Sequence, residues 1–292
     1  MTGRFRERDD GMTIDDLAVV RRAYAKQVLA AAAVADASLM RALAETERER
    51  FLGPGPWKLM RFGGNYVETP DADPVYLYTD DLVAIDAARG LNNGQPSFLS
   101  KLIHAARIRP GDHVVHVGTG TGYYTALMRC LAGPHGCVTG IEVDPGLAAR
   151  AADNLAGYPG ATVLAGDGGD TDFAPADVVF VNAGAVRPAP AWLDRLKDGG
   201  RLVLPLTVHG GDTGTRGAVF LVTRRGGAFE ARHVSPTRIF PCIGGREPDG
   251  EARLADAFAR GGGMDVTALH RRAPKRGDRL WLDGGDWCLT TG

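Results

Sequence analysis

The pattern of apolar and polar positions changes character near Phe98. Before it, apolar residues recur at helical spacing in two long segments, "IDDLAVVRRAYAKQVLAAAAV" and "DASLMRALAETERERFLG". Each segment predicts an amphipathic helix, and Asp36 is expected to cap the second, which ends at the Gly/Pro stretch of residues 53–56. From Phe98 onward, short apolar runs such as "HVVHVG" alternate with helical segments such as "YYTALMRCLAG". This alternation predicts βαβ units and a mostly parallel sheet.

The alternation continues through "GCVTGIEVD", "PGLAARAADNLAG", "ATVLAGDG", "ADVVFVNAG", "PAWLDRLKDGG" and "RLVLPLT". After Thr207 the segment "GAVFLVTRRGGAFEARHVS" has a Gly-Gly turn between two apolar runs, which predicts an antiparallel hairpin. A helix, "EARLADAFARGGG", and two short strands in "DRLWLDGGDWCLT" follow. The predicted fold is therefore α/β, a doubly wound, mostly parallel sheet that ends in an antiparallel hairpin and has an N-terminal helical extension.

Composition excludes several function classes. The 292 residues carry a formal net charge of −1, which indicates neither a basic surface for nucleic acid nor a basic patch for a membrane. No stretch approaches the roughly 18 apolar residues of a membrane span, and the charged N-terminus lacks a signal-peptide core. The four cysteines form no CxxC pair, and the histidines are too dispersed to predict a metal site. We expect a soluble cytoplasmic protein; its oligomeric state is not predicted.

A glycine-rich turn, "VGTGTGYY", follows the first strand of the alternating region. The glycines are Gly118, Gly120 and Gly122. No Gly-Lys-Ser/Thr follows, which excludes a Walker A loop, and the G-x-G-x-G spacing departs from the G-x-G-x-x-G of dinucleotide-binding turns. The glycine pattern alone does not exclude a tight strand-to-helix turn that binds no ligand.

Two carboxylates follow the next strands. Glu142 ends "GIEVD", about 20 residues beyond the glycines, where an acid accepts ribose hydroxyls in a doubly wound sheet. Asp167, in "GDG", is at the corresponding end of the third strand and is expected near an adenine amino group. Considered alone, Glu142 could be a solvent-exposed loop residue and Asp167 a helix N-cap. Because all three features share the carboxyl edge of the sheet, the sequence favours an adenine nucleoside as ligand.

This arrangement resembles the class I S-adenosylmethionine-dependent methyltransferases. The resemblance implies that the methionyl group lies along the glycine turn, the ribose at Glu142 and the adenine near Asp167. His116 stands where such enzymes usually carry an acid; a water-mediated contact with the methionyl ammonium and a bond to a neighbouring loop are equally open. The residues implied in cofactor binding are His116, Gly118, Thr119, Gly120, Gly122, Tyr123, Glu142, Asp167, Gly168 and Asn182.

Within that class, the chain resembles the protein-L-isoaspartate O-methyltransferase family. The matching segments are "DASLMRALAETERERFL", "HVVHVGTGTGYYTALMRCLAG", "GDG", "VVFVNAGAVRPAPAWLDRLKDGGRLVLPL" and "RIFPCIGG". They cover residues 36–245, and the last forty-odd residues have no counterpart. The resemblance implies transfer of a methyl group from S-adenosylmethionine to a carboxylate, with S-adenosylhomocysteine as product. A carboxylate is ionised at neutral pH, so this reaction needs no general base.

The chain departs from the family at the segment that meets the methyl acceptor. Family members carry Thr-Ile-Ser-x-Pro before the helix that leads into the first strand, whereas this sequence has "NNGQP". Amides can donate hydrogen bonds to a carboxylate as hydroxyls do, although such a loop is also an ordinary turn. The candidate catalytic residues are Asn92, Asn93, Gly94, Gln95 and Ser97.

The functional hypothesis is a Rossmann-like O-methyltransferase acting on a carboxylate of a protein, peptide or small molecule. The alternatives are a dedicated modifier of a peptide natural product or small metabolite, and a non-catalytic binding module for S-adenosylmethionine. The predicted divisions are a disordered N-terminus (1–12), a helical and substrate-side segment (13–97), a cofactor-binding domain (98–245) and a C-terminal helix with short strands packed on it (246–292).

Structural roles are predicted for three groups of side chains outside the candidate site. The pair Asp80 and Asp81 predicts a helix start. Trp281 and Trp287 are expected to fix the C-terminal tail onto the domain. The aromatic residues ahead of the NNGQ loop could wall a substrate pocket, although core packing is the favoured role; they are Trp57, Tyr66, Tyr76 and Tyr78.

Overall fold

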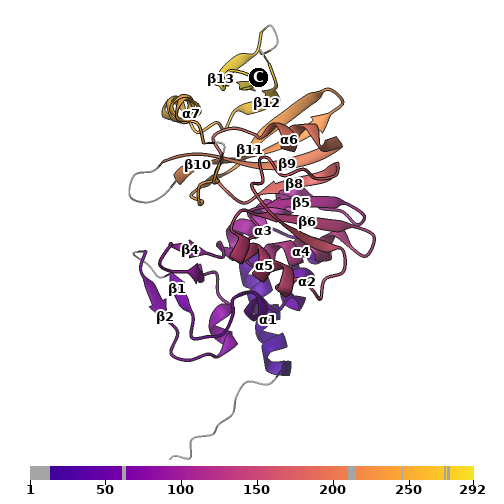
Figure 1. Ribbon diagram of the computed structural model, residues 1–292, viewed down its shortest axis with the longest axis vertical. Coiled ribbons are helices and arrows are strands. Elements are labelled where there is room, and N and C mark those ends of the chain that lie inside the picture. The colour runs from indigo at the N-terminus through magenta and orange to yellow at the C-terminus, as the bar shows by residue number, and fades with distance from the viewer. Residues whose placement is uncertain (1–13, 61–63, 210–214, 245, 273, 275–276) are drawn as a thin grey trace, which may run out of the picture.

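The computed structural model describes residues 14–60, 64–209, 215–244, 246–272, 274 and 277–292. The predicted disordered N-terminus, residues 1–12, lies outside the described residues. One large sheet runs along the long axis of the molecule (Figure 1). Its strands are β5 (His113–Val117), β6 (Cys137–Glu142), β7 (Ala161–Ala165), β8 (Ala176–Val181), β9 (Leu196–His209), β10 (Thr215–Arg225), β11 (Ala228–Thr237), β12 (Val266–His270), β13 (Arg279–Asp283) and β14 (Cys288–Thr291).

The sheet has a parallel half and an antiparallel half. The strand order is β13-β14-β12-β11-β10-β9-β8-β5-β6-β7. Strands β7, β6, β5, β8 and β9 are parallel, and every pairing from β9 to β13 is antiparallel. The predicted α/β fold, its hairpin around the Gly-Gly turn and its closing strand pair are confirmed, and the sheet is mixed rather than mostly parallel, because the antiparallel strands extend beyond the hairpin. Strand β12 had no prediction, and it joins that pair to the hairpin.

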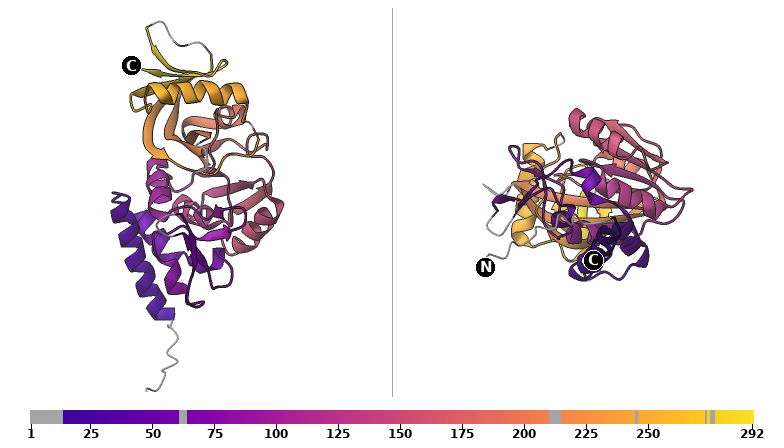
Figure 2. Two further views of the ribbon diagram at one scale, coloured as in Figure 1. Left: turned by 90° about the vertical axis from the view of Figure 1, so that its left-hand side faces the viewer. Right: turned by 90° about the horizontal axis from the view of Figure 1, so that it is seen from below.

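Helices cover both faces of the sheet. The α-helices are α1 (Ile14–Ala31), α2 (Ala37–Glu45), α3 (Pro96–Ala106), α4 (Tyr123–Ala132), α5 (Pro145–Asn154), α6 (Pro190–Asp194) and α7 (Pro248–Arg260). Because side chains of a strand alternate between faces, Val114 of β5 belongs to the buried cluster that includes α1 to α4, and Val115 to the one that includes α6 and α7. Figure 2 shows the N-terminal helices and α7 at opposite ends of the molecule.

Helix boundaries follow the predicted caps, with two corrections. Asp36 accepts hydrogen bonds from the backbone of Ser38 and Leu39, as a helix cap does. The helix predicted from Asp36 to Gly53 is wrong in length: α2 ends at Glu45, and a separate 3₁₀ turn, η1 (Arg48–Phe51), follows. The helix predicted in "PAWLDRLKDGG" is also too long, because α6 ends at Asp194 and β9 begins two residues later.

The segment between η1 and α3 is built from short elements that lack a clear sequence pattern. They are β1 (Lys58–Met60), β2 (Tyr66–Glu68), the 3₁₀ turn η2 (Pro74–Leu77), β3 (Ala84–Asp86) and β4 (Leu91–Asn92). Strand β1 pairs with β2, and β3 with β4. Residues Asp80 and Asp81 begin no helix, so that prediction is wrong. No helix among the described residues has the length and apolar character of a membrane span.

The C-terminal tail packs onto the sheet through its tryptophans. Trp281 of β13 and Trp287 before β14 are 8% and 4% exposed and belong to the same core as α7 and β9. Their predicted role in fixing the tail is confirmed. Of the earlier aromatic residues, Trp57 and Tyr78 are buried in packing clusters, as favoured.

Candidate active site

The three glycines of the turn after β5 all have positive φ, and each meets a different environment. Their φ angles are +79° at Gly118, +58° at Gly120 and +97° at Gly122. A Cβ on Gly118 would lie 3.1 Å from the backbone oxygen of Asn182, and one on Gly122 would lie 3.2 Å from Leu155. A Cβ on Gly120 would have only one atom of the described residues within 4 Å apart from its chain neighbours, a methyl group of Ile85 in β3 at 3.8 Å. The turn therefore presents its backbone to open space at Gly120.

Glu142 closes this turn from the end of β6. One carboxylate oxygen accepts the Gly120 N–H at 2.7 Å, and the other accepts the Asp144 N–H at 3.1 Å. The residue is 7% exposed. A carboxylate offers about four acceptor positions, so two backbone bonds leave capacity for a ligand hydroxyl. Glu142 therefore shapes the turn and keeps acceptor capacity for the hydroxyl of a ligand.

Asp167 follows β7 at the same edge of the sheet. Its Oδ1 accepts the Gly169 N–H at 2.8 Å, and a Cβ on Gly244 would lie 2.0 Å from its Oδ2. The chain after β11 therefore passes directly over this carboxylate. Burial and the nearby Asp167 charge raise the pKa of the Cys242 thiol to about 11. Gly168 packs against Val117 of β5, where a Cβ would lie 2.2 Å from a methyl group.

Three of the predicted cofactor residues turn their side chains into the core. His116 is fully buried, and its Nδ1 lies 2.8 Å from the hydroxyl of Thr125 in α4. Thr119 donates from its hydroxyl to the His116 carbonyl at 3.1 Å, and the Tyr123 ring packs edge-on against Phe51. One His116 nitrogen is thus satisfied by a helix residue rather than a loop, and burial lowers the pKa of the ring to about 3.

The polar atoms of the NNGQ loop bond mostly to neighbouring residues of the protein. Asn92 accepts the Gly94 N–H at 3.0 Å. Asn93 is 7% exposed, and its Oδ1 accepts the Val83 N–H at 3.0 Å. The Asn93 Nδ2 is buried and has no hydrogen-bond partner among the residues the structure describes. This amide is therefore the donor in the loop with unused capacity.

Asp80 organises the loop, and sequence reasoning missed it. Its carboxylate accepts the Ser97 N–H at 2.7 Å and the Ser97 hydroxyl at 2.6 Å. It also accepts from the side-chain amide of Gln95 at 3.0 Å. Asp80 thus caps α3 from 16 residues before the helix begins, because the N-cap residue Gln95 supplies no side-chain cap. A helix opening with Pro96 and lacking its own cap is the signal that indicates a remote acceptor.

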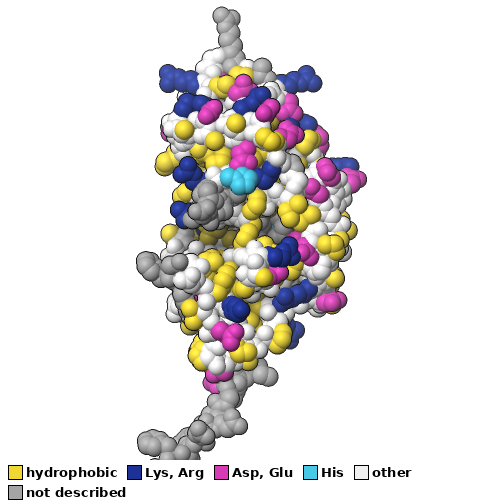
Figure 3. Space-filling view, turned by 60° about the vertical axis from the view of Figure 1, so that its left-hand side comes forward, with side chains coloured by type: hydrophobic (Ala, Val, Ile, Leu, Met, Phe, Trp, Pro, Cys, Tyr) yellow, Lys and Arg dark blue, Asp and Glu magenta, His cyan; other side chains and the backbone are white. Residues whose placement is uncertain are grey.

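Three contacts bring the loop to the glycine turn. The hydroxyl of Tyr124 in α4 donates to the Gly94 carbonyl at 3.1 Å. The Arg89 guanidinium, in the β3–β4 turn, pairs with Asp144 at 2.6 Å. Together with the Ile85 contact to Gly120, these place the β3–β4 hairpin and the NNGQ loop beside the turn. Figure 3 shows one face of the molecule, where hydrophobic side chains gather in a hollow between its two ends.

The residues at this edge suit a nucleoside that carries no phosphate. The turn exposes its backbone at Gly120, Glu142 has spare acceptor capacity, and residues 118–122 include no lysine or arginine. Among the described residues, no group of histidine, cysteine, aspartate and glutamate side chains is arranged to hold a metal ion. These features fit the adenosyl and methionyl groups of S-adenosylmethionine.

Comparison with protein families and relatives agrees with this geometry. A family model described as protein-L-isoaspartate(D-aspartate) O-methyltransferase matches residues 21–247. Protein-L-isoaspartate O-methyltransferase 2 of Anaeromyxobacter sp. (strain Fw109-5) is 31% identical over 226 residues, which are 76% of this chain and 82% of that protein. A protein-L-isoaspartate O-methyltransferase of Ignicoccus hospitalis is 42% identical over 133 residues, covering 44% of this chain and 62% of that protein.

Solved structures share the fold at low sequence identity. A structure named protein-L-isoaspartate O-methyltransferase superposes with a TM-score of 0.64 at 20% identity, covering 93% of this chain and 87% of its own. A Plasmodium falciparum structure, described as such an enzyme in complex with S-adenosyl-L-homocysteine, gives a TM-score of 0.58 at 15% identity. It covers 76% of this chain and 98% of its own. At these identities the superpositions show the fold alone.

Proposed function

Because the chain belongs to the protein-L-isoaspartate O-methyltransferase family and is thus an S-adenosylmethionine-dependent methyltransferase, we propose that it methylates a carboxylate of a peptide or protein. The single observation that carries the proposal is the bond from Tyr124 to the Gly94 carbonyl. It holds the NNGQ loop at the start of α4, beside the glycine turn where the cofactor binds. This position supports the loop as the counterpart of the family's acceptor segment.

Named residues of this chain would hold the cofactor. The ribose hydroxyls would donate to Glu142, the methionyl chain would follow the backbone of residues 118–122, and the adenine would lie near Asp167. When bound, S-adenosylmethionine supplies a methyl group on a sulfonium, which is already an electrophile. The chain therefore has only to position the acceptor in line and to exclude water.

The acceptor needs orientation rather than deprotonation. A carboxylate is ionised at neutral pH, so no side chain has to remove a proton. The Asn93 amide nitrogen, buried and unused by the described residues, is the donor we assign to the acceptor carboxylate. Its partner atom Oδ1 is already fixed by the Val83 N–H, which sets the direction of the amide.

We expect Asn93→Asp to lower kcat/KM about 10- to 100-fold, the loss expected for one hydrogen bond to a charged group. The aspartate still accepts the Val83 N–H but buries a charge, so the thermal unfolding midpoint is measured alongside to separate loss of the donor from loss of stability. It removes the donor and places a negative charge beside the acceptor. Steady-state kinetics on an accepted peptide checks this, and parent-like kcat/KM would remove Asn93 from the acceptor site.

We expect Glu142→Ala to weaken binding of S-adenosylhomocysteine by about 1–3 kcal/mol, the usual cost of leaving hydrogen-bonding groups unpaired. The variant loses the ribose acceptor and frees the Gly120 N–H. Calorimetric titration measures the affinity. Asp153→Ala, which removes an exposed carboxylate from α5, is the matched control and should bind like the parent. Equal affinity in Glu142→Ala and the parent would reject the ribose assignment.

Calorimetry followed by methyl transfer to an isoaspartyl peptide tests the proposed function as a whole. Binding of S-adenosylmethionine with transfer would support carboxyl methylation of isoaspartyl peptides, with the amide loop in place of the family hydroxyls. Binding without transfer to that peptide would favour a dedicated acceptor, because the NNGQ side chains differ from the family's segment. Absence of binding would overturn the proposal.

A further inference from the structure

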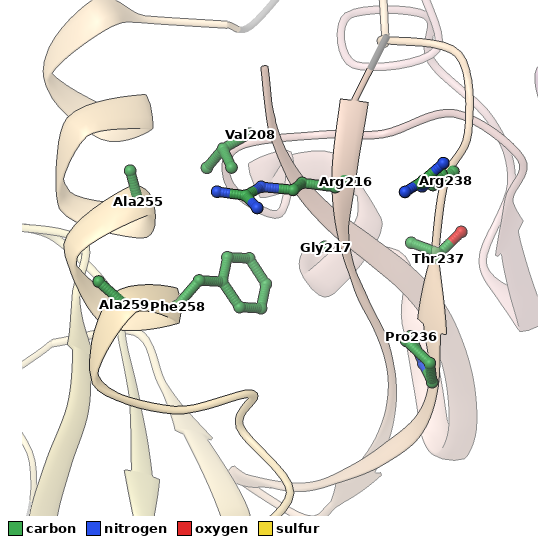
Figure 4. A pocket seen from close by; sticks show the side chains of 9 residues that line it. All are labelled: Val208, Arg216, Gly217, Pro236, Thr237, Arg238, Ala255, Phe258 and Ala259. Carbon is green, nitrogen blue, oxygen red and sulfur yellow. The ribbon is translucent and has the colours of Figure 1, made fainter. Parts of the chain in front are cut away.

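A pocket outside the cofactor site lies between α7 and the ends of β9, β10 and β11. Its volume is about 520 Å³. Figure 4 shows the ring of Phe258 pointing into it from α7, Arg216 reaching across toward α7, and Arg238 on the opposite wall. A second hollow of about 580 Å³ adjoins it and shares Val208, Arg216 and Ala255. The full lining of the first pocket is Val208, Arg216, Gly217, Pro236, Thr237, Arg238, Ala255, Phe258 and Ala259.

The pocket combines an apolar floor with two arginine side chains, Arg216 and Arg238, on its walls. Val208 is 5% exposed, and Phe258 packs against the same core. Arg216 and Arg238 are both exposed, and neither guanidinium forms an ion pair or a hydrogen bond with the residues the structure describes. Arg246, beside the second hollow, is already paired with Glu251 at 3.2 Å. A ligand with a carboxylate next to a large apolar group matches this lining.

The pocket lies along the same edge of the sheet as the cofactor site. Gly217 of β10 is opposite Thr207 of β9, and a Cβ on Gly184, in the loop after β8, would lie 2.1 Å from the Thr207 hydroxyl. Three strand spacings of about 4.8 Å separate β10 from β5, which is about 14 Å. An extended peptide spans about 3.3 Å per residue, so about four or five residues cover this separation.

Helix α7 supplies a wall of the pocket that the family-matched part of the chain lacks. The helix begins at Pro248, just beyond the residues that the family model matches. Three of its residues, Ala255, Phe258 and Ala259, form one wall, and strands of the family fold form the other. The family-matched part of the chain alone would leave Arg216 and Val208 on an open sheet face.

We propose that this pocket binds an acidic and apolar segment of the methyl-accepting polypeptide, about four or five residues from the methylated carboxylate. The inference rests on the proposed function for the identity of the acceptor. Arg216 and Arg238 bind the acidic side chain, and Phe258 with Val208 contacts the apolar one. The pocket thereby selects the polypeptide, whereas the NNGQ loop orients the reacting carboxylate.

Dye-labelled synthetic peptides test the pocket directly. Each carries one isoaspartate, with a Glu-Phe pair four or five residues before or after it; matched peptides carry Lys-Ser instead. Fluorescence anisotropy in the presence of S-adenosylhomocysteine measures binding. We expect a Glu-Phe peptide to bind at least about tenfold more tightly than its Lys-Ser match, the effect of one charge-assisted contact with apolar burial.

Charge-reversed variants test whether the preference for the Glu-Phe peptide depends on the pocket arginines. The double variant Arg216→Glu, Arg238→Glu should abolish the preference for the Glu-Phe peptide. If that variant does not fold, the milder double variant Arg216→Gln, Arg238→Gln should still reduce the preference. Arg22→Glu with Arg41→Glu changes the same charge on exposed positions of α1 and α2 and should leave the preference intact. Equal binding of the two peptides, or a preference that survives in the pocket variants, would overturn the inference.

Methyl transfer to the same peptides separates the two proposals. Arginine-dependent binding without transfer to any peptide would keep the pocket and reject the isoaspartyl acceptor. Transfer with equal kcat/KM for both peptides, unchanged in the pocket variants, would keep the function and reject the pocket. Calorimetry with S-adenosylhomocysteine should give parent affinity in the pocket variants, because both arginines lie away from the glycine turn.

Discussion

We expect Arg48→Met to lower the free energy of unfolding by about 3–5 kcal/mol, the range for removing one partner of a buried charged network. The Arg48 side chain is fully buried, and its guanidinium donates to the carbonyls of Leu77, Thr79 and Asp81. It also lies over the rings of Tyr24 and Tyr123 at 5.7 and 5.9 Å. Methionine fills similar volume but leaves three carbonyls without these donors.

Arg50→Met, two residues along in η1, is the matched control. Arg50 is 70% exposed and pairs with Glu47, so its loss should cost less than about 1 kcal/mol. Chemical denaturation of both variants gives the comparison. Arg48→Met should also impair methyl transfer, because the carbonyls that Arg48 binds flank Asp80, which fixes Ser97 and Gln95. Equal stability of the two variants would show that the guanidinium contributes little to holding this segment.

The second large effect is a loss of stability in acid that comes from His116. Burial lowers the pKa of its ring from 6.5 to about 3, so the folded chain keeps the ring neutral where the unfolded chain binds a proton. Above pH 6.5 neither state is protonated there, and the group adds no pH dependence. As pH falls from 6.5 toward 3, the unfolded state gains protons and stability decreases by about 1.4 kcal/mol per pH unit. Between pH 6.5 and about 4.5 the loss is about 2–3 kcal/mol.

Urea unfolding across this range, on the parent and on His116→Gln, isolates the contribution. Glutamine keeps a polar group beside the Thr125 hydroxyl but does not titrate. Subtracting the two stability curves should leave a slope of about one proton, confined to the interval below pH 6.5. Parallel curves would mean that the His116 ring is protonated equally in both states.

The parallel half of the sheet could be predicted because its signals are local. The strand of His113–Val117, the glycine turn and the helix after it each carry their pattern within about ten residues, and so does the Gly-Gly hairpin of β10 and β11. Strands β1 to β4 have two or three residues each, which is too few for a periodic pattern. They form because Arg48, Asn93 and Thr69 bind backbone groups distant in sequence.

The candidate site likewise has features that local sequence signals indicate and features that depend on tertiary packing. The placement of Glu142 and Asp167 beside the glycine turn was predictable, because the carboxyl ends of parallel strands meet at one edge of a sheet. The orientation of His116, Thr119 and Tyr123 depends on packing against Thr125, Ile141 and Phe51, which no spacing in the sequence indicates. Asp80 was missed because its partner, Ser97, is 17 residues away and the intervening chain has no regular pattern.

The C-terminal strands continue the main sheet, so the tail cannot be detached from it. Strand β12 pairs with β11 at Phe229 and Glu230, and β14 and β13 follow outward. A chain shortened to the length of the family match would expose the edge of β11 at Phe229 and Glu230, next to apolar core stripped of Trp281 and Trp287. Open edges of this kind recruit strands from other molecules, and the shortened chain would aggregate. The tail therefore covers apolar core and part of a sheet edge, apart from any role in binding.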